Sequence, residues 1–316
     1  MRKLLITRPL PDVVIAAAKV RYETTVRDNT APLSPDELRA ALRDYDAILP
    51  TLGDLFRADV FADIPHLRAK ILANFGVGYN HIDVIATRAA GIAVTNTPGA
   101  VTDATADIAM TLMLMTARRA GEGERMLRAG QWAGWHPTQM LGTHVTGARV
   151  GIIGMGRIGK AIARRCHYGF GMDVVFHNRS AVADPGCPAR QVPMATALAA
   201  DFVIVAVPGS PATHHLINAD TLAQMRPDGI LINISRGDVV DESALIAALQ
   251  SRQIAGAGLD VYEFEPQIPA ALQVMENVAL LPHLGTAVPQ VRQAMGLMAV
   301  ANLIAHLDGI PLPNAV

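Results

Sequence analysis

Cysteine is scarce in this chain of 316 residues, which has only Cys166 and Cys187. Two thiols form no metal-ligand cluster, and so few in a chain this long suggest a reducing compartment. Aromatic residues make up 4% and charged residues 17% of the chain, whereas hydrophobic residues reach 51%. This composition is far from that of disordered chains and is sufficient for a buried core. We therefore expect a globular protein with no metal site.

Neither sign of charge dominates, because 27 lysines and arginines oppose 28 aspartates and glutamates, for a formal net charge of −1. No overall field draws such a chain to nucleic acid or to an anionic membrane. Long hydrophobic runs are also missing, since the best candidate, 108–117, is about half of a membrane span. The first apolar stretch stops at Arg8-Pro9, too early for a signal peptide. These absences predict a soluble cytoplasmic protein without nucleic-acid or membrane partners.

Short β-branched segments alternate with longer segments of helical period, the pattern of βαβ units around a mainly parallel sheet. At roughly 100–200 residues per domain, the length favours two domains. A first α/β unit precedes Thr97-Pro98-Gly99. Its strands are predicted at 4–7, 47–49, 70–73 and 93–95, and its helices at 11–20, 35–43 and 82–90.

A long segment of helical spacing, 101–129, follows, and we expect it to break at Gly121-Glu122-Gly123. The next segment, 130–146, has no regular period and is predicted to be a loop. The βαβ alternation then restarts, and six strands suit a complete doubly wound domain. These strands are predicted at 149–153, 173–177, 202–207, 230–234, 254–259 and 278–281, with helices at 157–167, 194–200, 219–225 and 241–251.

The predicted fold is therefore α/β, with two Rossmann-like doubly wound domains built on parallel sheets. We assign residues 99–285 to a dinucleotide-binding domain. A closing helix at 287–307 has no further strand of its own to cover, so we expect it to return to the first domain. That domain then consists of residues 1–98 and 286–316.

A glycine-rich turn follows the strand at 149–153 and leads directly into a helix: Gly154-Met155-Gly156-Arg157-Ile158-Gly159. The first glycine permits a tight turn, the second lets a pyrophosphate approach the backbone, and the third lets helix and strand pack closely. The pyrophosphate then lies on the free N–H groups at the start of the helix. This context predicts dinucleotide binding; the alternative is a glycine turn without a ligand.

The end of the next strand bears on the choice of cofactor. An NAD-preferring site places Asp or Glu there, roughly 20 residues after the first glycine, to bind the ribose 2′-hydroxyl. Here the strand ends in His177-Asn178-Arg179-Ser180, without a carboxylate. Arg179 can pair with a 2′-phosphate, with Asn178 and Ser180 as further donors. The residues favour NADP(H) over NAD(H), unless Arg179 is simply a solvated loop side chain.

Three later strand ends each carry a polar side chain at the carboxyl edge of the predicted sheet: Arg236, Glu265 and His283. Arg236 could bind a substrate carboxylate and polarise a carbonyl. His283 could donate a proton to the carbonyl oxygen as hydride arrives, with Glu265 holding it in orientation. Singly, these residues could be a surface charge, a loop carboxylate and a core histidine. Together, after a dinucleotide turn, they favour reduction of a 2-keto acid.

Several motifs support this interpretation along nearly the whole chain: Asn74-Phe75-Gly76-Val77-Gly78-Tyr79-Asn80-His81-Ile82-Asp83, Asn96-Thr97-Pro98-Gly99, the glycine turn, Val207-Pro208, Ile232-Asn233-Ile234-Ser235-Arg236-Gly237, Gly258-Leu259-Asp260-Val261 through Glu265-Pro266, and Pro282-His283. By these motifs the chain resembles the D-isomer-specific 2-hydroxyacid dehydrogenases, in particular their glyoxylate/hydroxypyruvate reductase branch. The resemblance places Arg236, Glu265 and His283 on the family's catalytic positions. It also implies an NADPH-using enzyme, in agreement with the charge argument.

The resemblance further implies binding roles in both domains. The backbone amides of Val77 and Gly78 would receive the substrate carboxylate, unless this segment is an ordinary tight turn. Asp260 would bind the nicotinamide amide. Ile234, Ser235 and Gly285 would line the same ring, and Val207, Pro208 and Thr213 would flank the adenosine.

Members of the family close two domains over a deep cleft, with the N-terminal segment and the C-terminal helix forming the substrate domain. Related proteins are homodimers joined through their nucleotide domains, with the helix at 101–119 in the interface. In the reductase branch a partner tryptophan reaches the substrate pocket. Trp135 is the candidate here, although a buried loop anchor fits it equally well.

The leading hypothesis is NADPH-dependent reduction of glyoxylate or hydroxypyruvate. A larger keto acid such as an aryl pyruvate is the nearest alternative, because Leu52, Phe75 and Trp135 could line a small or a wide pocket. Phosphoglycerate oxidation is disfavoured because no regulatory domain follows Val316, and formate oxidation because Glu265 is present. A dinucleotide-sensing module like the co-repressors of this fold remains an alternative from another class, although the chain shows no basic or peptide-binding extension.

Overall fold

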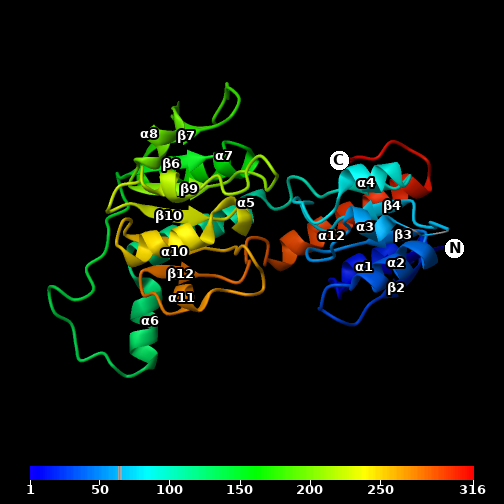
Figure 1. The fold of residues 1–316 in the computed structure, drawn as a ribbon, viewed down its shortest axis with the longest axis horizontal. Helices are drawn as coiled ribbons and strands as arrows, with labels where there is room; N and C mark the ends of the chain where they lie inside the picture. The colour runs from blue at the N-terminus through cyan, green and yellow to red at the C-terminus, as the bar shows by residue number, and fades with distance from the viewer. Residues whose placement is uncertain (63, 65) are drawn as a thin grey trace. The chain divides into compact units, whose positions relative to one another are not determined.

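The computed structural model describes residues 1–62, 64 and 66–316. The chain folds into two compact units, of which the first contains Met1–Val101 and Ala287–Val316 and the second Thr102–Thr286 (Figure 1). The boundaries predicted from the sequence are 98/99 and 285/286. Among the described residues, no helix is both long and apolar enough to cross a membrane.

The first unit contains a five-stranded parallel sheet with the order β2-β1-β3-β4-β5. This is a doubly wound order, because the connections reverse direction beside β1. The strands are β1 (Arg2–Ile6), β2 (Tyr22–Val26), β3 (Ala47–Leu49), β4 (Ile71–Ala73) and β5 (Ala93–Thr95). The helices are α1 (Asp12–Lys19), α2 (Pro35–Asp44), α3 (Ala58–Phe61), α4 (Val84–Ala89) and α12 (Pro289–Leu307).

Local sequence accounts for most of these elements. Ser34 and Glu37 form a reciprocal capping box at the start of α2, with Pro35 in its first turn. The closing helix α12 belongs to this unit and packs on α1 so tightly that a Cβ on Gly296 would lie 2.4 Å from Val14. Two elements were not predicted from the sequence. They are β2, which is an edge strand with a polar face, and the single-turn helix α3.

The second unit contains a seven-stranded parallel sheet with the order β12-β11-β10-β9-β6-β7-β8. Its direction of winding reverses between β6 and β9, so the glycine turn after β6 lies at the switch point, where ligands bind in open α/β sheets. The strands are β6 (Arg149–Ile153), β7 (Asp173–His177), β8 (Arg190–Gln191), β9 (Phe202–Val205), β10 (Ile230–Asn233), β11 (Gly256–Leu259) and β12 (Val278–Leu280).

Helices cover both faces of this sheet, and buried aliphatic side chains fill the space between the layers. The helices are α5 (Thr102–Ala117), α6 (Ala120–Arg128), α7 (Arg157–Arg164), α8 (Met194–Leu198), α9 (Ala219–Leu222), α10 (Glu242–Gln250) and α11 (Ala270–Gln273), with a π-helical turn at Arg165–Gly169 and a 3₁₀ turn at Gly237–Val239. The prediction of six strands was one short, because β8 has two exposed polar residues and no apolar pattern. The short helix α11 was also missed.

The predicted break at Gly121-Glu122-Gly123 was wrong. The chain bends at Arg119, whose φ of 51° is left-handed, and both glycines lie inside α6. Two hydrogen bonds of 2.6 and 2.8 Å from the guanidinium of Arg119 to Glu122 hold the bend. The ion pair between Arg119 and Glu122 therefore determines where the helix breaks, and the weak helix propensity of the two glycines does not. After α6, the segment 130–146 forms neither helix nor strand, as expected, and projects from the sheet of its unit (Figure 1).

Candidate active site

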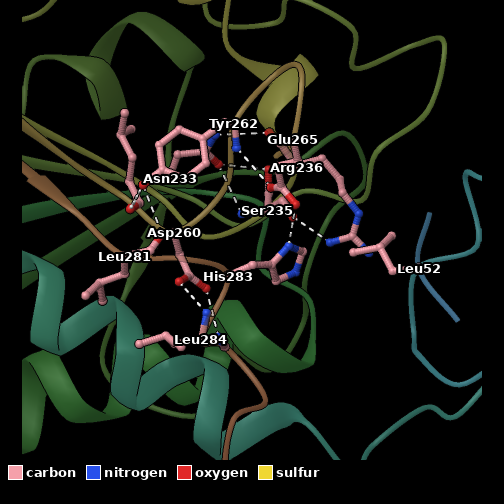
Figure 2. A network of polar contacts seen from close by, with 12 residues as sticks. Leu52, Asn233, Ser235, Arg236, Asp260, Tyr262, Glu265, Leu281, His283 and Leu284 are labelled. Atoms are coloured by element: carbon pink, nitrogen blue, oxygen red, sulfur yellow. Dashed lines mark hydrogen bonds and ion pairs between the residues drawn. The ribbon is translucent and has the colours of Figure 1, made fainter. Parts of the chain in front are cut away.

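The carboxyl ends of three neighbouring parallel strands bring Arg236, Glu265 and His283 together. Arg236 follows β10, Glu265 lies in the loop after β11, and His283 follows β12, and these strands are adjacent in the sheet. Figure 2 shows the three side chains facing one another from their separate loops. The predicted cluster therefore exists within the second unit.

Glu265 contacts His283 directly. Its Oε2 lies 2.9 Å from Nδ1 of His283, and its Oε1 accepts a hydrogen bond of 3.0 Å from the backbone N–H of Tyr262. Burial alone would raise the pKa of Glu265, but these contacts and the charges of His283 and Arg236 lower it below its ordinary value. Glu265 is therefore a carboxylate at neutral pH. Because Nδ1 of His283 is engaged, Nε2 is the nitrogen left for a reacting group.

The backbone holds His283 in an uncommon conformation. Its φ of 54° is left-handed, which is rare outside glycine and is found at functional sites. Its N–H donates to the carbonyl of Asp260 at 2.9 Å. The carboxylate of Asp260, which is 2% exposed, accepts from the N–H groups of Leu284 at 2.6 Å and Gly285 at 2.9 Å. Asp260 thus fixes the turn that carries the histidine.

The environment of Asp260 also affects its own ionisation. Burial raises its pKa, and Glu265 adds to this effect, whereas the two amides and His283 oppose it. Both carboxylate oxygens already accept a bond within the turn, so a nicotinamide amide would use their remaining lone pairs. The predicted role of Asp260 in cofactor binding is compatible with this geometry.

Close packing and a side-chain amide position Arg236. Asn233 donates from Nδ2 to the carbonyl of Arg236 at 3.0 Å, and its Oδ1 accepts from the N–H of Ser235 at 3.0 Å. A Cβ on Gly237 would lie 1.8 Å from the backbone of Tyr262, so only glycine lets the Arg236 loop pack against the Glu265 loop. Burial lowers the pKa of Arg236, against the effect of Glu265 and Asp238, and leaves the guanidinium charged.

The glycine turn after β6 has the geometry that dinucleotide binding needs. Gly154 has a φ of 101°, and a Cβ there would lie 2.9 Å from the backbone of Ala206. A Cβ on Gly159 would lie 2.1 Å from the carbonyl of Gly154, whereas one on Gly156 would meet no protein atom within 4 Å. The first and third glycines thus satisfy internal packing, and the second leaves open space beside the N-terminus of α7. Met155, Arg157 and Ile158 complete this turn.

The strand end predicted to select the cofactor is ordered by its own polar groups. Asn178 accepts from the N–H of Met155 at 3.2 Å and donates to the carbonyl of Ser180 at 2.9 Å. The loop therefore begins beside the glycine turn. Arg179 is exposed, and within the described part of the chain its guanidinium makes no hydrogen bond or ion pair.

Two further predicted groups lie at the strand ends of the second unit. Thr213 donates to the carbonyl of Pro208 at 2.7 Å and accepts from the N–H of Ser210 at 2.9 Å, which closes the loop after β9 that begins at Val207. Ile234 and Ser235 are both 6% exposed directly after β10. All of these residues lie at the same carboxyl edge of the sheet.

In the first unit, two asparagines shape the segment of Val77 and Gly78. Asn74 donates from Nδ2 to the carbonyls of Gly76 and Gly78, both at 3.0 Å, and Asn96 donates to the carbonyl of Val77 at 2.9 Å. The carbonyls are thereby turned toward the protein. Over residues 1–62, 64 and 66–316, the N–H groups of Val77 and Gly78 donate to no protein acceptor, so they are available to an anion.

Leu52 and Trp135 are the two remaining residues that were predicted to contact the substrate. The carbonyl of Leu52 accepts a hydrogen bond of 2.5 Å from Arg8, which fixes the turn before Gly53. Trp135 is 79% exposed in the projecting segment, so the alternative that it is a buried loop anchor is wrong.

Three residues that position the loops of the site through hydrogen bonds to backbone carbonyls were not predicted from the sequence. Asn74 is 1% exposed and Asn233 is 1% exposed, and each directs its side chain to loop carbonyls. Tyr262 joins the ends of β11 and β12 by donating to the carbonyl of Leu281 at 2.9 Å. A signal existed for both asparagines, because each ends an apolar strand and precedes a glycine-containing loop.

A separate group, His214, His215 and Glu263, brings its potential metal-ligand atoms within 4.8 Å of one another. The two imidazole rings are stacked with centroids 3.9 Å apart and planes 25° from parallel. Nε2 of His215 is hydrogen-bonded to Glu263 at 2.9 Å, so this nitrogen already has a protein partner. We interpret the contact between His215 and Glu263 as structural.

Known proteins resemble this chain over its full length. The family model described as D-isomer specific 2-hydroxyacid dehydrogenase, NAD binding domain, matches residues 110–285. A glyoxylate reductase of Thermococcus onnurineus is 41% identical over 99% of this chain and 95% of its own length. A glycerate dehydrogenase of Hyphomicrobium methylovorum is 35% identical over 100% of this chain and 99% of its own length.

Solved structures agree. An NADPH-dependent glyoxylate/hydroxypyruvate reductase of Sinorhizobium meliloti, in complex with NADP and malonate, has a TM-score of 0.88 at 37% identity, covering 100% of this chain and 96% of that chain. A doubly wound sheet with a glycine turn at its switch point and polar side chains at the same edge defines an NAD(P)-binding oxidoreductase. More narrowly, the chain belongs to the D-isomer-specific 2-hydroxyacid dehydrogenase family. The resemblance carried by the sequence motifs is thereby confirmed.

Proposed function

We propose that this protein reduces a small 2-keto acid of the glyoxylate/hydroxypyruvate class to the D-2-hydroxy acid, with NADPH as hydride donor and His283 as proton donor. The observation that carries the proposal is the contact of His283 with Glu265 beside Arg236. Besides a hydride, keto-acid reduction needs a positioned acid and a cation near the carboxylate and carbonyl. The names of the two reductases reported above support this substrate class.

The residues divide the reaction among them. When bound, the nicotinamide supplies a hydride to the carbonyl carbon. The electron pair of the carbonyl π bond moves to the oxygen, which takes a proton from Nε2 of His283. Glu265 holds the ring through Nδ1, which leaves Nε2 directed to the reacting oxygen. Arg236 places a permanent positive charge beside the developing oxyanion and the substrate carboxylate.

We assign recognition of the substrate carboxylate to the N–H groups of Val77 and Gly78 as well as to Arg236. Support comes from the free amides and from the inward-turned carbonyls of that segment. Leu52, together with Trp135 from a partner subunit, would line the rest of the pocket. The binding roles of Val207, Pro208, Thr213, Ile234, Ser235, Asp260 and Gly285 are proposed as the resemblance implies.

NADPH preference rests on Arg179. Arginine pairs with a phosphate through several N–H donors, and no carboxylate lies at this strand end to repel the 2′-phosphate. We expect Arg179→Ala to raise KM for NADPH about tenfold or more, the value of one charge-assisted bond, with little effect on NADH. Arg179→Lys, which keeps the charge, is the matched control and should lose less. An unchanged KM for NADPH would refute the assignment.

One steady-state panel tests the proposal as a whole. NADPH and NADH are crossed with glyoxylate, hydroxypyruvate, pyruvate and phenylpyruvate, and kcat/KM is compared. A higher kcat/KM for phenylpyruvate than for glyoxylate and hydroxypyruvate would show that the substrate is a larger 2-keto acid. A best turnover below about 0.1 per second, against a typical enzyme value of about 10, would favour the dinucleotide-sensing alternative. His283→Ala should remove most of the rate while NADPH still binds.

A homodimer joined through the second unit is part of the proposal. The projecting segment and α6 expose apolar side chains, among them Leu127, Trp132, Trp135 and Leu141. Such clustered exposure is typical of an interaction site. Sedimentation analysis should give twice the mass of the 33.5 kDa chain. Trp135→Ala should then raise KM for the keto acid without dissociating the dimer.

A further inference from the structure

Gln191 lies outside every site assigned so far, on the short edge strand β8. Its Oε1 accepts a hydrogen bond of 3.0 Å from the N–H of Val182. Its Nε2 donates to the carbonyls of Asn178 at 3.1 Å and Ser180 at 3.0 Å. One side-chain amide therefore holds three backbone groups of the loop 178–182, the loop that carries Arg179.

These contacts determine how the loop presents its N–H groups. In a planar trans peptide the carbonyl and the following N–H point in opposite directions. Because the carbonyls of Asn178 and Ser180 point at Gln191, the N–H groups of Arg179 and Ala181 point away from it. Among the described residues, neither N–H has a protein acceptor.

The same loop is tied to the glycine turn. Asn178 accepts from the N–H of Met155 at 3.2 Å, and its Nδ2 donates to the carbonyl of Ser180 at 2.9 Å. A continuous set of hydrogen bonds thus runs from Gln191 through the loop to the turn. Backbone N–H groups that point to the same side of a loop favour the binding of an anion, and the Arg179 guanidinium supplies the charge.

We infer that Gln191 is a positioning residue for cofactor selection, which holds the loop 178–182 so that the amides of Arg179 and Ala181 and the side chains of Arg179 and Ser180 receive the 2′-phosphate of NADPH. The inference rests on the proposed NADPH preference. Gln191 acts through the loop and does not itself contact the phosphate. NADH lacks the 2′-phosphate and gains nothing from this arrangement.

The test compares ligands with and without that phosphate. Titration calorimetry on the wild-type protein and on Gln191→Leu measures Kd for NADPH, NADH, 2′,5′-ADP and 5′-AMP. We expect Gln191→Leu to weaken NADPH and 2′,5′-ADP about tenfold, and NADH and 5′-AMP by less than about twofold. In steady state, the loss should fall on KM for NADPH rather than on kcat. Gln253→Leu, in an exposed turn of the same unit, is the matched control and should change neither ligand pair.

Gln191→Glu gives a second, nearly isosteric variant. Its carboxylate cannot donate to the two carbonyls and repels them, so it should also lose affinity for the 2′-phosphate ligands selectively. Equal weakening of all four ligands in both variants, or unchanged NADPH affinity, would overturn the role of Gln191. If the wild-type protein itself failed to prefer 2′,5′-ADP over 5′-AMP, the proposed NADPH preference would fall first and the inference with it. A wild-type preference that survives in both variants would overturn the inference alone.

Discussion

The Nδ1 atom of His283 lies 2.9 Å from Oε2 of Glu265, although the two residues are 18 positions apart in the chain. The contact orients the imidazole and leaves Nε2 to serve as the acid. The other oxygen of Glu265 is held by a backbone N–H, so the carboxylate has one available arrangement. Two strand-end loops are thus joined at the point where proton transfer is proposed.

Replacing the negative charge of Glu265 should slow the reaction without preventing cofactor binding. Glu265→Gln keeps the size of the side chain but replaces the carboxylate that orients the imidazole through Nδ1 with a neutral amide, so kcat should fall about 100-fold. Stopped-flow and steady-state assays with NADPH and glyoxylate measure this loss. Glu263→Gln, two residues earlier in the same loop, is the control and should retain activity. A Glu265→Gln enzyme with wild-type kcat would rule out the orienting role.

The segment of Val77 and Gly78 should respond to the asparagine behind it. Asn74→Ala removes both bonds to the carbonyls of Gly76 and Gly78, so the peptide groups can rotate and the N–H groups lose their common direction. KM for the keto acid should rise about tenfold, while KM for NADPH stays within about twofold. Asn29→Ala, in an exposed turn of the same unit, is the control. Equal increases in both KM values would indicate a general loss of structure.

The two glycines of the turn should separate folding from cofactor binding. A Cβ on Gly159 would lie 2.1 Å from the Gly154 carbonyl, so Gly159→Ala should lower Tm by several degrees, a cost on the order of 1–3 kcal/mol. A Cβ on Gly156 meets no protein atom, so Gly156→Ala should keep its Tm but weaken NADPH binding. Differential scanning fluorimetry with and without NADPH measures both effects. Intact NADPH binding by Gly156→Ala would contradict the pyrophosphate site.

Stability should depend on pH through Glu242, which is 6% exposed. Burial raises the pKa of Glu242 and the charge of Glu263 adds to this effect, whereas the backbone N–H of Glu263 opposes it. The folded protein therefore binds the proton more tightly than the unfolded chain, and stability is lost as pH rises above the ordinary value of 4.5. Glu242→Gln should raise Tm at pH 7, by roughly 2–4 °C for each kcal/mol gained.

The advantage of Glu242→Gln should shrink as the pH falls toward 4.5 and vanish below it, because the wild-type side chain is protonated in both the folded and the unfolded states only below that value. Glu23→Gln, at an exposed position, should show no such dependence. Thermal melts of the three proteins at several pH values make the comparison. A Glu242→Gln protein that is less stable than wild type at pH 7 would contradict the sign of the effect.

Local patterns in the sequence were sufficient for the α/β class, for most strands and for the glycine turn. The strand β6 and its turn were predictable because buried β-branched runs and glycine spacing are properties of neighbouring residues. The same holds for the bounds of β3, β5 and β7. The chemical roles of Arg236, Glu265 and His283 could be predicted from their residue types and their positions after strands. For each residue taken singly, an ordinary structural role remained an alternative.

Only the tertiary structure could bring these groups together, because strand order sets which loops meet and long-range pairing leaves no local signal. The bend at Arg119 depends on an ion pair rather than on glycine, and the two-residue strand β8 exists because β7 offers it an edge. Gln191 had no distinguishing feature in the sequence, yet on that strand it holds the loop of Arg179. Residue type determined what each group can do, and packing between distant segments decided which groups act together.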